Sequence, residues 1–517
     1  IDPLIRDMYE YFSLYEEKND GPAALLFSDG TKVGARLDRL GLRPLRSIET
    51  TEYVCVMSEA GQIDFPPEEV ITRGRIEAGG MLYFDHETGE SYTTESIEKN
   101  LAKEADYKVL LEKKKLALED LPKVELPEQN SELDTYERAV AYGMNQESFR
   151  FLLDPMIQGA AEKISAMGYG VSLNVLNADE GGMSRYFSQR FAQVTNPPLD
   201  SIREKDGMTL RVSLGAKPNF SESDSKQIVI QNPFLTLAEL SSIRAQKDLT
   251  TCTVDILYTP SKDKEENESN LNSALEQICK EVEAAARAKN GIIILSDKNI
   301  SKSQAAIPLL LAIAASNQHL IEQGLRFNSS LIAETGQIAS SHDVATALGF
   351  GSSAICPLTI EDRAQSLMPN EVDKALSNYR KAIAKSLMKI MGKFGLCTAE
   401  SYIGGEIFES NYLNTEDPQL KKHFPNITSP VGGVGYAEIA ASASEWHFKA
   451  FGIKDENDIP HLGLFKERQG GAGHSFGLVA VREYINMTEE EVLYSIDEEL
   501  EDIFERFELK EVFPNAL

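Results

Sequence analysis

The stretch "ETGQIASSHDVATALGFGSSAICP", residues 334–357, carries the pattern that decides the fold. It predicts the end of a strand, a turn at Gly336, a helix, and a second strand that ends at Pro357. Barrels that bind flavins or phosphate esters use such a unit to hold a phosphate on backbone N–H groups at the start of the helix. Whether this unit holds an anion is therefore the first functional question.

The start of the expected helix offers only part of a phosphate site. Ser340, Ser341 and Asp343 suit a helix start, with Ser341 as the expected N-cap. The second strand ends in Cys356-Pro357, where a phosphate grip needs another glycine, and proline has no N–H to donate. We therefore expect a structural relic of this architecture and not an anion site.

Strands and helices alternate from about residue 134 to residue 357. The runs "KQIVIQNPFLT", "CTVDILY", "GIIILSD", "SSLIAETG" and "SAICP" are typical of buried strands, and the later ones are separated by helical segments such as 271–289. This alternation predicts a parallel sheet or an α/β barrel.

The regions on either side differ in pattern. Residues 21–90 are β-rich, with a hairpin expected at Asp29-Gly30. Residues 94–133 predict a connector, a charged helix followed by a stretch with prolines, in which the run Lys113 to Lys115 is a solvated helix face and not a nucleic-acid patch. From Glu371 onward the sequence predicts a long helix, glycine-rich loops and an acidic helical end.

Composition excludes several classes of partner. The chain of 517 residues predicts roughly three domains, and its formal charge of −29 disfavours nucleic acid and anionic membranes. The longest apolar run found, residues 307–315, is far short of the ~20 residues of a membrane helix. Five scattered cysteines indicate no metal site and favour a reducing cytoplasm. Because the chain opens with Ile1 and shows no signal peptide, we expect a piece of a longer protein.

Two acids near predicted strand ends are candidates for chemistry. Glu334 and His342 could form a base and its partner, although a histidine bonded to local backbone at a helix start is the simpler expectation. Asp297 follows "GIIILS", where α/β proteins often place functional acids, and a helix cap explains it equally well.

The remaining candidates point away from catalysis. His423 and His447 lack a metal-like spacing, and Cys397 lies in an apolar region that favours burial over nucleophilic reactivity. No Ser–His–Asp elbow, P-loop or GxGxxG is present. From the residues alone, the chain is a multidomain α/β protein with no catalytic centre.

Several stretches nevertheless resemble one family in its own order. Residues 20–46 ("DGPAALLFSDGTKVGARLDRLGLRPLR") and 58–85 resemble the back portion of the class II glutamine amidotransferase domain of the glutamate synthase large subunit. Three stretches are similar to the central domain of that same large subunit, namely "FAQVTNPPLDSIRE" (191–204), "SLGAKPN" (213–219) and "NPFLTLAEL" (232–240). Residues 378–409 and "SPVGGVGYAEIA" (429–440) resemble the lead-in to its flavin barrel. Asn19 and Leu40 are mild departures, where the family usually has tryptophan and asparagine.

The resemblance implies an α/β fold class with three parts. A β-rich remnant of an αββα N-terminal-nucleophile amidotransferase domain (1–95) and a connector (96–133) precede a central, degenerate TIM-barrel-like domain (134–370). A helical and loop-rich start of the FMN-binding synthase domain follows (371–517), divergent after about residue 477.

The resemblance also implies an activity for the parent protein. That enzyme makes L-glutamate from L-glutamine and 2-oxoglutarate by glutamine hydrolysis, internal ammonia transfer and flavin-dependent reductive amination. FMN and an iron–sulfur cluster are expected in the parent and no cofactor in this chain, which is itself expected to be inactive. Its expected partners are the other amidotransferase and barrel regions and a small electron-donating subunit or ferredoxin.

One stretch is a candidate interface element along the ammonia path. Pro197 and Pro198 fix φ and hold Asn196 extended, while Arg203 is suited to a bidentate pair with a carboxylate. A surface loop stiffened by proline is an equal alternative. Two rivals to the whole interpretation stay open, a stand-alone binding or regulatory protein built on the central domain and a divergent flavin enzyme that uses residues 334–357.

Overall fold

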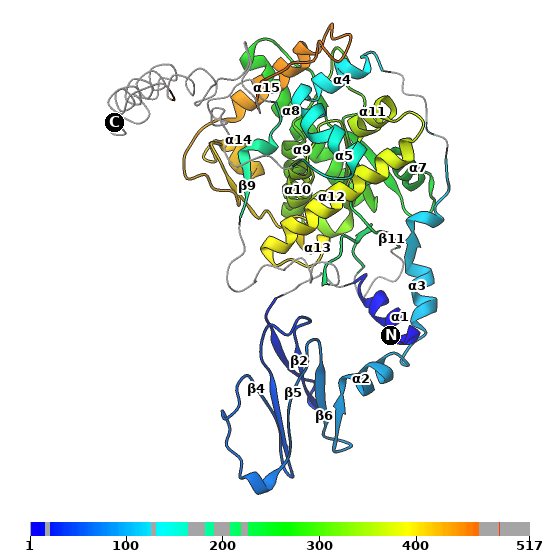
Figure 1. Ribbon diagram of the computed structural model, residues 1–517, viewed down its shortest axis with the longest axis vertical. Helices are drawn as coiled ribbons and strands as arrows, with labels where there is room; N and C mark the ends of the chain where they lie inside the picture. The colour runs from blue at the N-terminus through cyan, green and yellow to red at the C-terminus, as the bar shows by residue number, and fades with distance from the viewer. Residues whose placement is uncertain are drawn as a thin grey trace, which may run out of the picture.

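The computed structural model describes residues 2–15, 21–124, 126, 131–163, 181–190, 207–218, 226–464 and 485. A small β-rich part formed by the N-terminal residues lies below a larger α/β part in Figure 1, and helices α1 and α3 lie between the two. The sequence predicted this mixed α/β character, and the structure confirms it.

The β-rich part contains two antiparallel sheets. One has the order β1-β2-β6-β7 and the other the order β4-β3-β5. Their bounds are β1 Ala24–Ser28, β2 Lys32–Leu37, β3 Arg46–Thr50, β4 Val54–Met57, β5 Val70–Arg75, β6 Met81–Asp85 and β7 Glu90–Thr93, with a 3-10 turn at Pro67–Glu69. The hairpin predicted at Asp29-Gly30 joins β1 to β2, and Gly30 has φ +96°, which favours glycine. The Asp29 carboxylate accepts the N–H groups of Thr31 and Lys32 and so shapes the turn.

The predicted connector is more structured than its composition suggested. It contains α2 (Thr94–Leu101), α3 (Tyr107–Lys114), strand β8 (Lys115–Ala117) and a 3-10 turn (Leu118–Asp120). Strand β8 pairs in parallel with β11 (Gln227–Ile230), which pairs antiparallel with β10 (Val212–Leu214). The segment therefore supplies a strand to the larger part of the molecule.

The prediction that Lys113 to Lys115 form a solvated helix face is wrong for two of the three lysines. Only Lys113 is exposed. Lys114 is buried near the ring of Tyr15, and Lys115 forms an ion pair with Glu10 of α1 (Pro3–Phe12). The reason is tertiary, because α1 packs against α3 and covers this end of the helix.

The larger part is built on a four-stranded parallel sheet of order β12-β14-β16-β17. The strands are β12 Thr251–Asp255, β14 Ile292–Ser296, β16 Ser330–Thr335 and β17 Ala354–Pro357. Helices alternate with them as predicted, namely α7 Leu237–Ala245, α8 Lys264–Arg287, α9 Leu309–Glu322, α10 Ser341–Gly349 and α11 Leu358–Leu367. A small ladder joins β13 (Leu257–Tyr258) to β15 (Ala305–Ala306).

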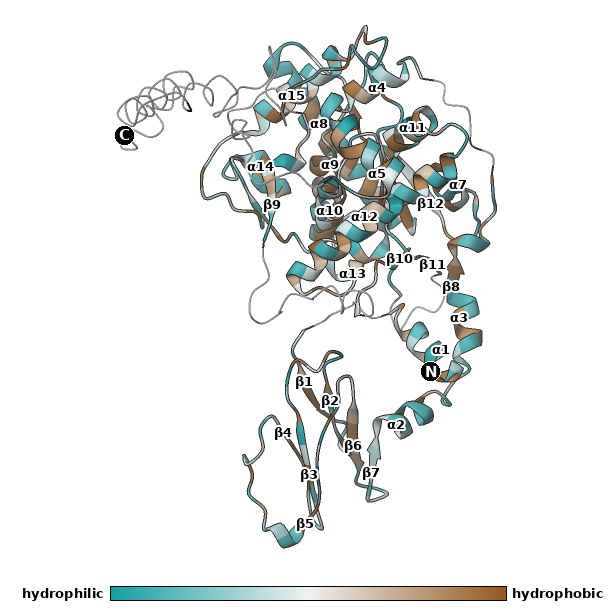
Figure 2. Cartoon of the chain, viewed as in Figure 1, coloured by the Kyte–Doolittle hydropathy of each residue, from teal (hydrophilic) through white to brown (hydrophobic). Residues whose placement is uncertain are grey.

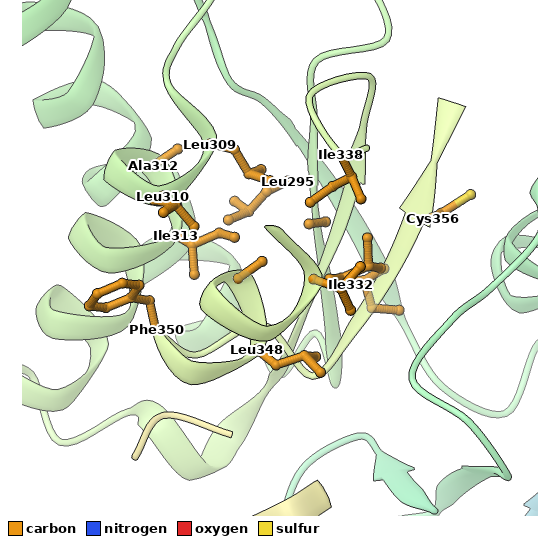
Figure 3. Close-up of a cluster of buried hydrophobic side chains, with 14 of the residues drawn as sticks. Leu295, Leu309, Leu310, Ala312, Ile313, Ile332, Ile338, Leu348, Phe350 and Cys356 are labelled. Atoms are coloured by element: carbon orange, nitrogen blue, oxygen red, sulfur yellow. The ribbon is translucent and has the colours of Figure 1, made fainter. Parts of the chain in front are cut away.

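Helix α9 is one of the helices that bury the sheet. It contains most of the apolar run 307–315, and its residues 309–318 are all buried. Leu310 and Ile313 extend from α9 in the hydrophobic cluster that also includes Leu295 of β14 and Ile332 of β16 (Figure 3). Burying a side chain of this kind stabilises the fold by roughly 1.5–3 kcal/mol. None of the described helices is long and apolar enough to cross a membrane.

The remaining elements pack around this sheet. They are α4 Thr135–Ala141, a π-helical turn Ser148–Leu153, α5 Asp154–Gly159, a 3-10 turn Ser184–Tyr186, β9 Phe187–Gln189, a 3-10 turn Arg326–Asn328, α12 Val372–Phe394, α13 Ala399–Tyr402, β18 Phe408–Ser410, α14 Pro418–His423 and α15 Tyr436–Lys449. Helix α12 packs against α5, α15 packs against α8, and β18 pairs with β9. One hydrophobic core includes residues on both sides of the boundary predicted at residue 370.

Candidate functional site at the carboxyl edge of the central sheet

The four parallel strands end at one edge of the sheet, which is where α/β proteins usually place ligands. Two of the acids singled out in the sequence lie at this edge. Glu334 is near the end of β16, and Asp297 directly follows β14. Both are buried, so their partners decide what they can do.

Glu334 is held in a salt bridge. Both of its oxygens accept hydrogen bonds from the Arg244 guanidinium, at 2.9 and 2.7 Å, and the Ser296 hydroxyl donates to it at 2.6 Å. Burial raises the pKa of this carboxyl, but the hydrogen bond and charge of Arg244 outweigh burial, and the net pKa is lowered. Glu334 is therefore a structural carboxylate at neutral pH and a poor general base.

Asp297 ties the ends of β14 and β16 together. Its carboxylate accepts hydrogen bonds from the Thr335 hydroxyl at 2.6 Å, the Gly336 N–H at 2.9 Å and the Gln337 amide at 2.9 Å. Burial raises its pKa to about 6 despite these donors. The alternative that Asp297 caps the next helix is wrong, because Pro308 occupies the N-cap position of α9.

Protein carboxylates already occupy the helix start where the phosphate site was considered. Ser340, and not Ser341 as predicted, is the N-cap of α10. Asp343 accepts the N–H groups of Ala339 and Ser340 at 3.0 and 2.8 Å, and Glu162 accepts both the N–H and the hydroxyl of Ser341. An anion here would meet two carboxylates, so these residues do not fit a flavin phosphate.

Gly336 serves packing at this turn. A Cβ added to it would lie 2.1 Å from the ring of Tyr142, and the Tyr142 hydroxyl donates to the Asp297 carbonyl oxygen at 3.0 Å. At the other strand end, Pro357 closes β17 and forms the N-cap of α11 without an N–H. The absence of a side chain at Gly336 thus leaves room for the ring of Tyr142 to pack against this turn.

The histidine and cysteine candidates are dispersed. His342 is not paired with Glu334, since its Nε2 lies 3.0 Å from the Ser184 carbonyl oxygen. His423 on α14 and His447 on α15 are buried, and burial lowers the pKa of each, that of His423 to about 4. Cys397 is buried, as predicted. Within the described ranges, no group of three or more His, Cys, Asp or Glu residues is placed to hold a metal ion.

A cavity of about 730 Å³ lies at the carboxyl edge of the sheet and was not predicted from the sequence. Its walls come from residues 131–149, from the segment after β14 and from α11. The charged lining residues are Glu132, Arg138, Lys298, Asp362 and Arg363. Lys298 directly follows Asp297 at the strand end, and that position was the available signal for it.

The candidate interface residues are not among those that the structure describes. Asn196, Pro197, Pro198 and Arg203 fall outside the described residues, so their placement stays a prediction.

The fold and the site define a class of protein, in which a β-rich part is joined to a central α/β domain whose sheet edge carries a buried ion pair and a helix start bonded to protein carboxylates. The family described as "Glutamate synthase central domain" matches residues 137–414, more than half of the chain, and "Glutamine amidotransferases class-II" matches residues 1–110. The chain therefore belongs to the glutamate synthase family, as the resemblance predicted.

The similar proteins are much longer than this chain. The ferredoxin-dependent glutamate synthase of Oryza sativa is 32% identical over 92% of this chain and 30% of its own length. The NADPH glutamate synthase large chain of Bacillus subtilis is 33% identical over 91% of this chain and 31% of its own. The chain thus spans about a third of these relatives. The flavin-binding domain of baker's yeast flavocytochrome b2 aligns with 52% of this chain over 88% of its own length, at 11% identity and with a TM-score of 0.27.

Proposed function

We propose that this chain is the framework between the two active sites of a glutamate synthase. In that enzyme, ammonia released from L-glutamine is carried internally to a flavin site, where it aminates 2-oxoglutarate. One observation supports the proposal most strongly: an amidotransferase match and a central-domain match follow each other on one chain, in the order of the relatives.

The junction between the two parts suits a framework. Glu10 of α1 accepts two hydrogen bonds from Arg211, both at 2.7 Å, and one from Lys115 at 2.6 Å. Arg211 belongs to the larger part, and Lys115 opens strand β8, which joins the sheet of that part. Burial raises the pKa of Glu10, but the hydrogen bonds and charges of Lys115 and Arg211 outweigh burial, and the net pKa is lowered. The carboxylate is therefore charged at neutral pH. These contacts attach the amidotransferase part firmly to the central domain.

Strand β1 suits a domain that continues beyond this chain. Leu25, Leu26 and Phe27 are 58%, 67% and 50% exposed, and β1 is an edge strand of hydrophobic composition (Figure 2). Exposed apolar edge strands are rare in isolated domains because they aggregate. We infer that further residues of the amidotransferase domain cover this strand in the intact protein.

We propose that the central domain is a degenerate barrel. Phe234 pairs in parallel with Ile355 of β17, so the segment that precedes α7 lies beside the last strand of the sheet. This neighbour relation resembles the closing pair of an α/β barrel. With carboxylates at the start of α10, such a barrel would serve as a scaffold and not as a flavin site.

We infer that the cofactors bind to other regions of the enzyme and that a separate protein donates the electrons. FMN and an iron–sulfur cluster would belong to other regions of the parent, and ferredoxin or a small subunit would supply electrons, in line with the names of the relatives. We also propose that the protein works in the cytoplasm. A reducing cytoplasm suits the five cysteines, although the rice relative is named as chloroplastic.

The stretch 191–204 is proposed as part of the ammonia path. Replacing Arg203 by alanine in the complete enzyme should leave glutamine hydrolysis largely intact and lower the glutamate formed per glutamine consumed. A variant with unchanged coupling would refute this role.

The function is tested on the complete polypeptide that contains this segment. Supplied with glutamine, 2-oxoglutarate and either reduced ferredoxin or NADPH together with a small electron-donating subunit, it should form two molecules of glutamate for each glutamine consumed. If glutamate formation does not depend on 2-oxoglutarate, the proposal is wrong, and the alternative of a non-catalytic binding or regulatory protein gains support.

A further inference from the structure

The cavity at the carboxyl edge of the central sheet takes no part in the framework function described above. Its volume of about 730 Å³ lies within the range of small-molecule sites, roughly 300–1,000 Å³. It is bounded by α4, by the segment that follows β14 and by α11. Carboxyl ends of parallel strands are the usual place for a ligand in such folds.

Most charges that line this cavity are neutralised by protein partners. Arg138 donates to Asp362 at 2.7 Å, which ties α4 to α11. Arg363 is bonded to Asp154 and to Glu456, at 2.7 and 2.8 Å, and its guanidinium lies over the ring of Phe149. These two arginines therefore form walls and are not available to a ligand.

Lys298 differs from the arginines. It is half-buried, and no described carboxylate forms an ion pair with it. Two buried acids lie near it. The charge of Lys298 helps to lower the pKa of Glu334, but both oxygens of Glu334 are already held by Arg244, and the Asp297 carboxylate accepts from Thr335, Gly336 and Gln337. In a chain with a formal charge of −29, a half-buried ammonium without a carboxylate partner is notable. The same side chain also lines a neighbouring cavity of about 190 Å³.

Glu132 also lines the cavity, with an exposed carboxylate. The other lining groups are neutral, with both polar and aromatic side chains. Ser301 and Ser366 offer hydroxyl groups, Asn299 offers an amide, and Tyr136 offers a ring. One available cation beside such walls matches a ligand with one anionic group and an uncharged body. We propose that this cavity binds a small molecule that carries a single phosphate or carboxylate group, which Lys298 pairs with directly.

Thermal unfolding of the full chain at constant ionic strength tests the proposal, with chloride as the reference anion. Phenyl phosphate and benzoate are the probes, because each has one anionic group and a ring that the cavity can accommodate. At least one should raise the unfolding temperature in a saturable manner, since a ligand that binds only the folded state stabilises it. Saturation by phenyl phosphate alone assigns a phosphate ligand, and saturation by benzoate alone assigns a carboxylate.

Two variants separate binding in the cavity from other effects. Lys298→Met should weaken the affinity for the responding probe by about tenfold or more, the effect of losing a charge-assisted hydrogen bond. Ser366→Trp keeps every charge and should weaken it by filling the cavity. The control is Lys389→Met, which removes an exposed lysine of α12 outside the cavity and should bind as the original chain does. Absence of saturation with both probes, or equal affinity in the Lys298 variant and the control, overturns the proposal.

Discussion

Removing Arg244 should show how far the sheet edge depends on one ion pair. Arg244→Met leaves Glu334, which is 1% exposed, without its guanidinium partner and with only the Ser296 hydroxyl donating to it. Removing one partner of a buried pair costs about 3–5 kcal/mol. Because the Arg244 side chain is itself 30% exposed, water can enter its place, and we expect about 3 kcal/mol at neutral pH.

The loss should depend on pH in a defined direction. In the original chain the pKa of Glu334 is lowered, so its ionised form stabilises the fold above the unfolded pKa of about 4.3, and this contribution disappears as pH falls through the folded pKa. Without Arg244, burial is opposed only by the Ser296 hydroxyl and the charge of Lys298, and we expect burial to raise the pKa of Glu334 above the unfolded value. The penalty should then be largest at neutral pH and shrink as the carboxyl is protonated in acid.

Urea unfolding measures this loss, followed by the fluorescence of Trp446, which is the only tryptophan in the chain and lies in the same core. The double variant Arg244→Met, Glu334→Gln should recover most of the loss, because no charge stays buried. Arg287→Met is the control, since its pair with Glu283 is on the surface and contributes less than about 1 kcal/mol. A loss below about 1 kcal/mol, or one that does not vary with pH, would refute the reasoning.

Three further predictions concern the junction, the turn and the chain's own activity. Glu10→Ala should speed hydrogen exchange in α1 and β8 at neutral pH. Because the pKa of Glu10 is lowered in the fold, the stabilisation by its carboxylate is present above the unfolded pKa of about 4.3 and is lost in acid, where the variant and the original chain should exchange alike. Equal exchange at neutral pH would contradict this prediction. Gly336→Ala should lower the free energy of unfolding by about 1–3 kcal/mol through its clash with Tyr142, whereas Gly159→Ala, which meets no atom within 4 Å, should cost little; equal losses in the two variants would count against this packing role. The chain by itself should release no ammonia from glutamine above the rate in buffer and should bind no flavin, and stoichiometric flavin after purification would argue against the second expectation.

The parts of the fold that follow from local pattern were predictable. Apolar runs such as residues 292–295 identified the parallel strands, and Asp29-Gly30 identified a hairpin, because strand periodicity and turn chemistry are properties of neighbouring residues. The helix start was displaced by one residue, since Ser340 and Ser341 are equivalent as caps until tertiary contacts choose between them.

What could not be predicted depends on residues far apart in sequence. Nothing local shows that Lys115 meets Glu10 or that β8 pairs with β11 across more than a hundred residues. The function of Glu334 was equally hidden, because its partner Arg244 lies 90 residues earlier in the chain. The cavity beside Lys298 arises only when α4 and α11 come together.

Coupling between the two reactions tests the framework function most directly. In the complete enzyme, glutamate formed per glutamine consumed is measured for Glu10→Ala, with Glu112→Ala as a control because Glu112 is an exposed glutamate of α3. If this chain holds the two active sites in a fixed relative position, the Glu10 variant should still hydrolyse glutamine but form clearly fewer than two glutamates for each glutamine consumed. The control should still form two. A Glu10 variant that loses this junction and still couples the two reactions fully would contradict the framework function.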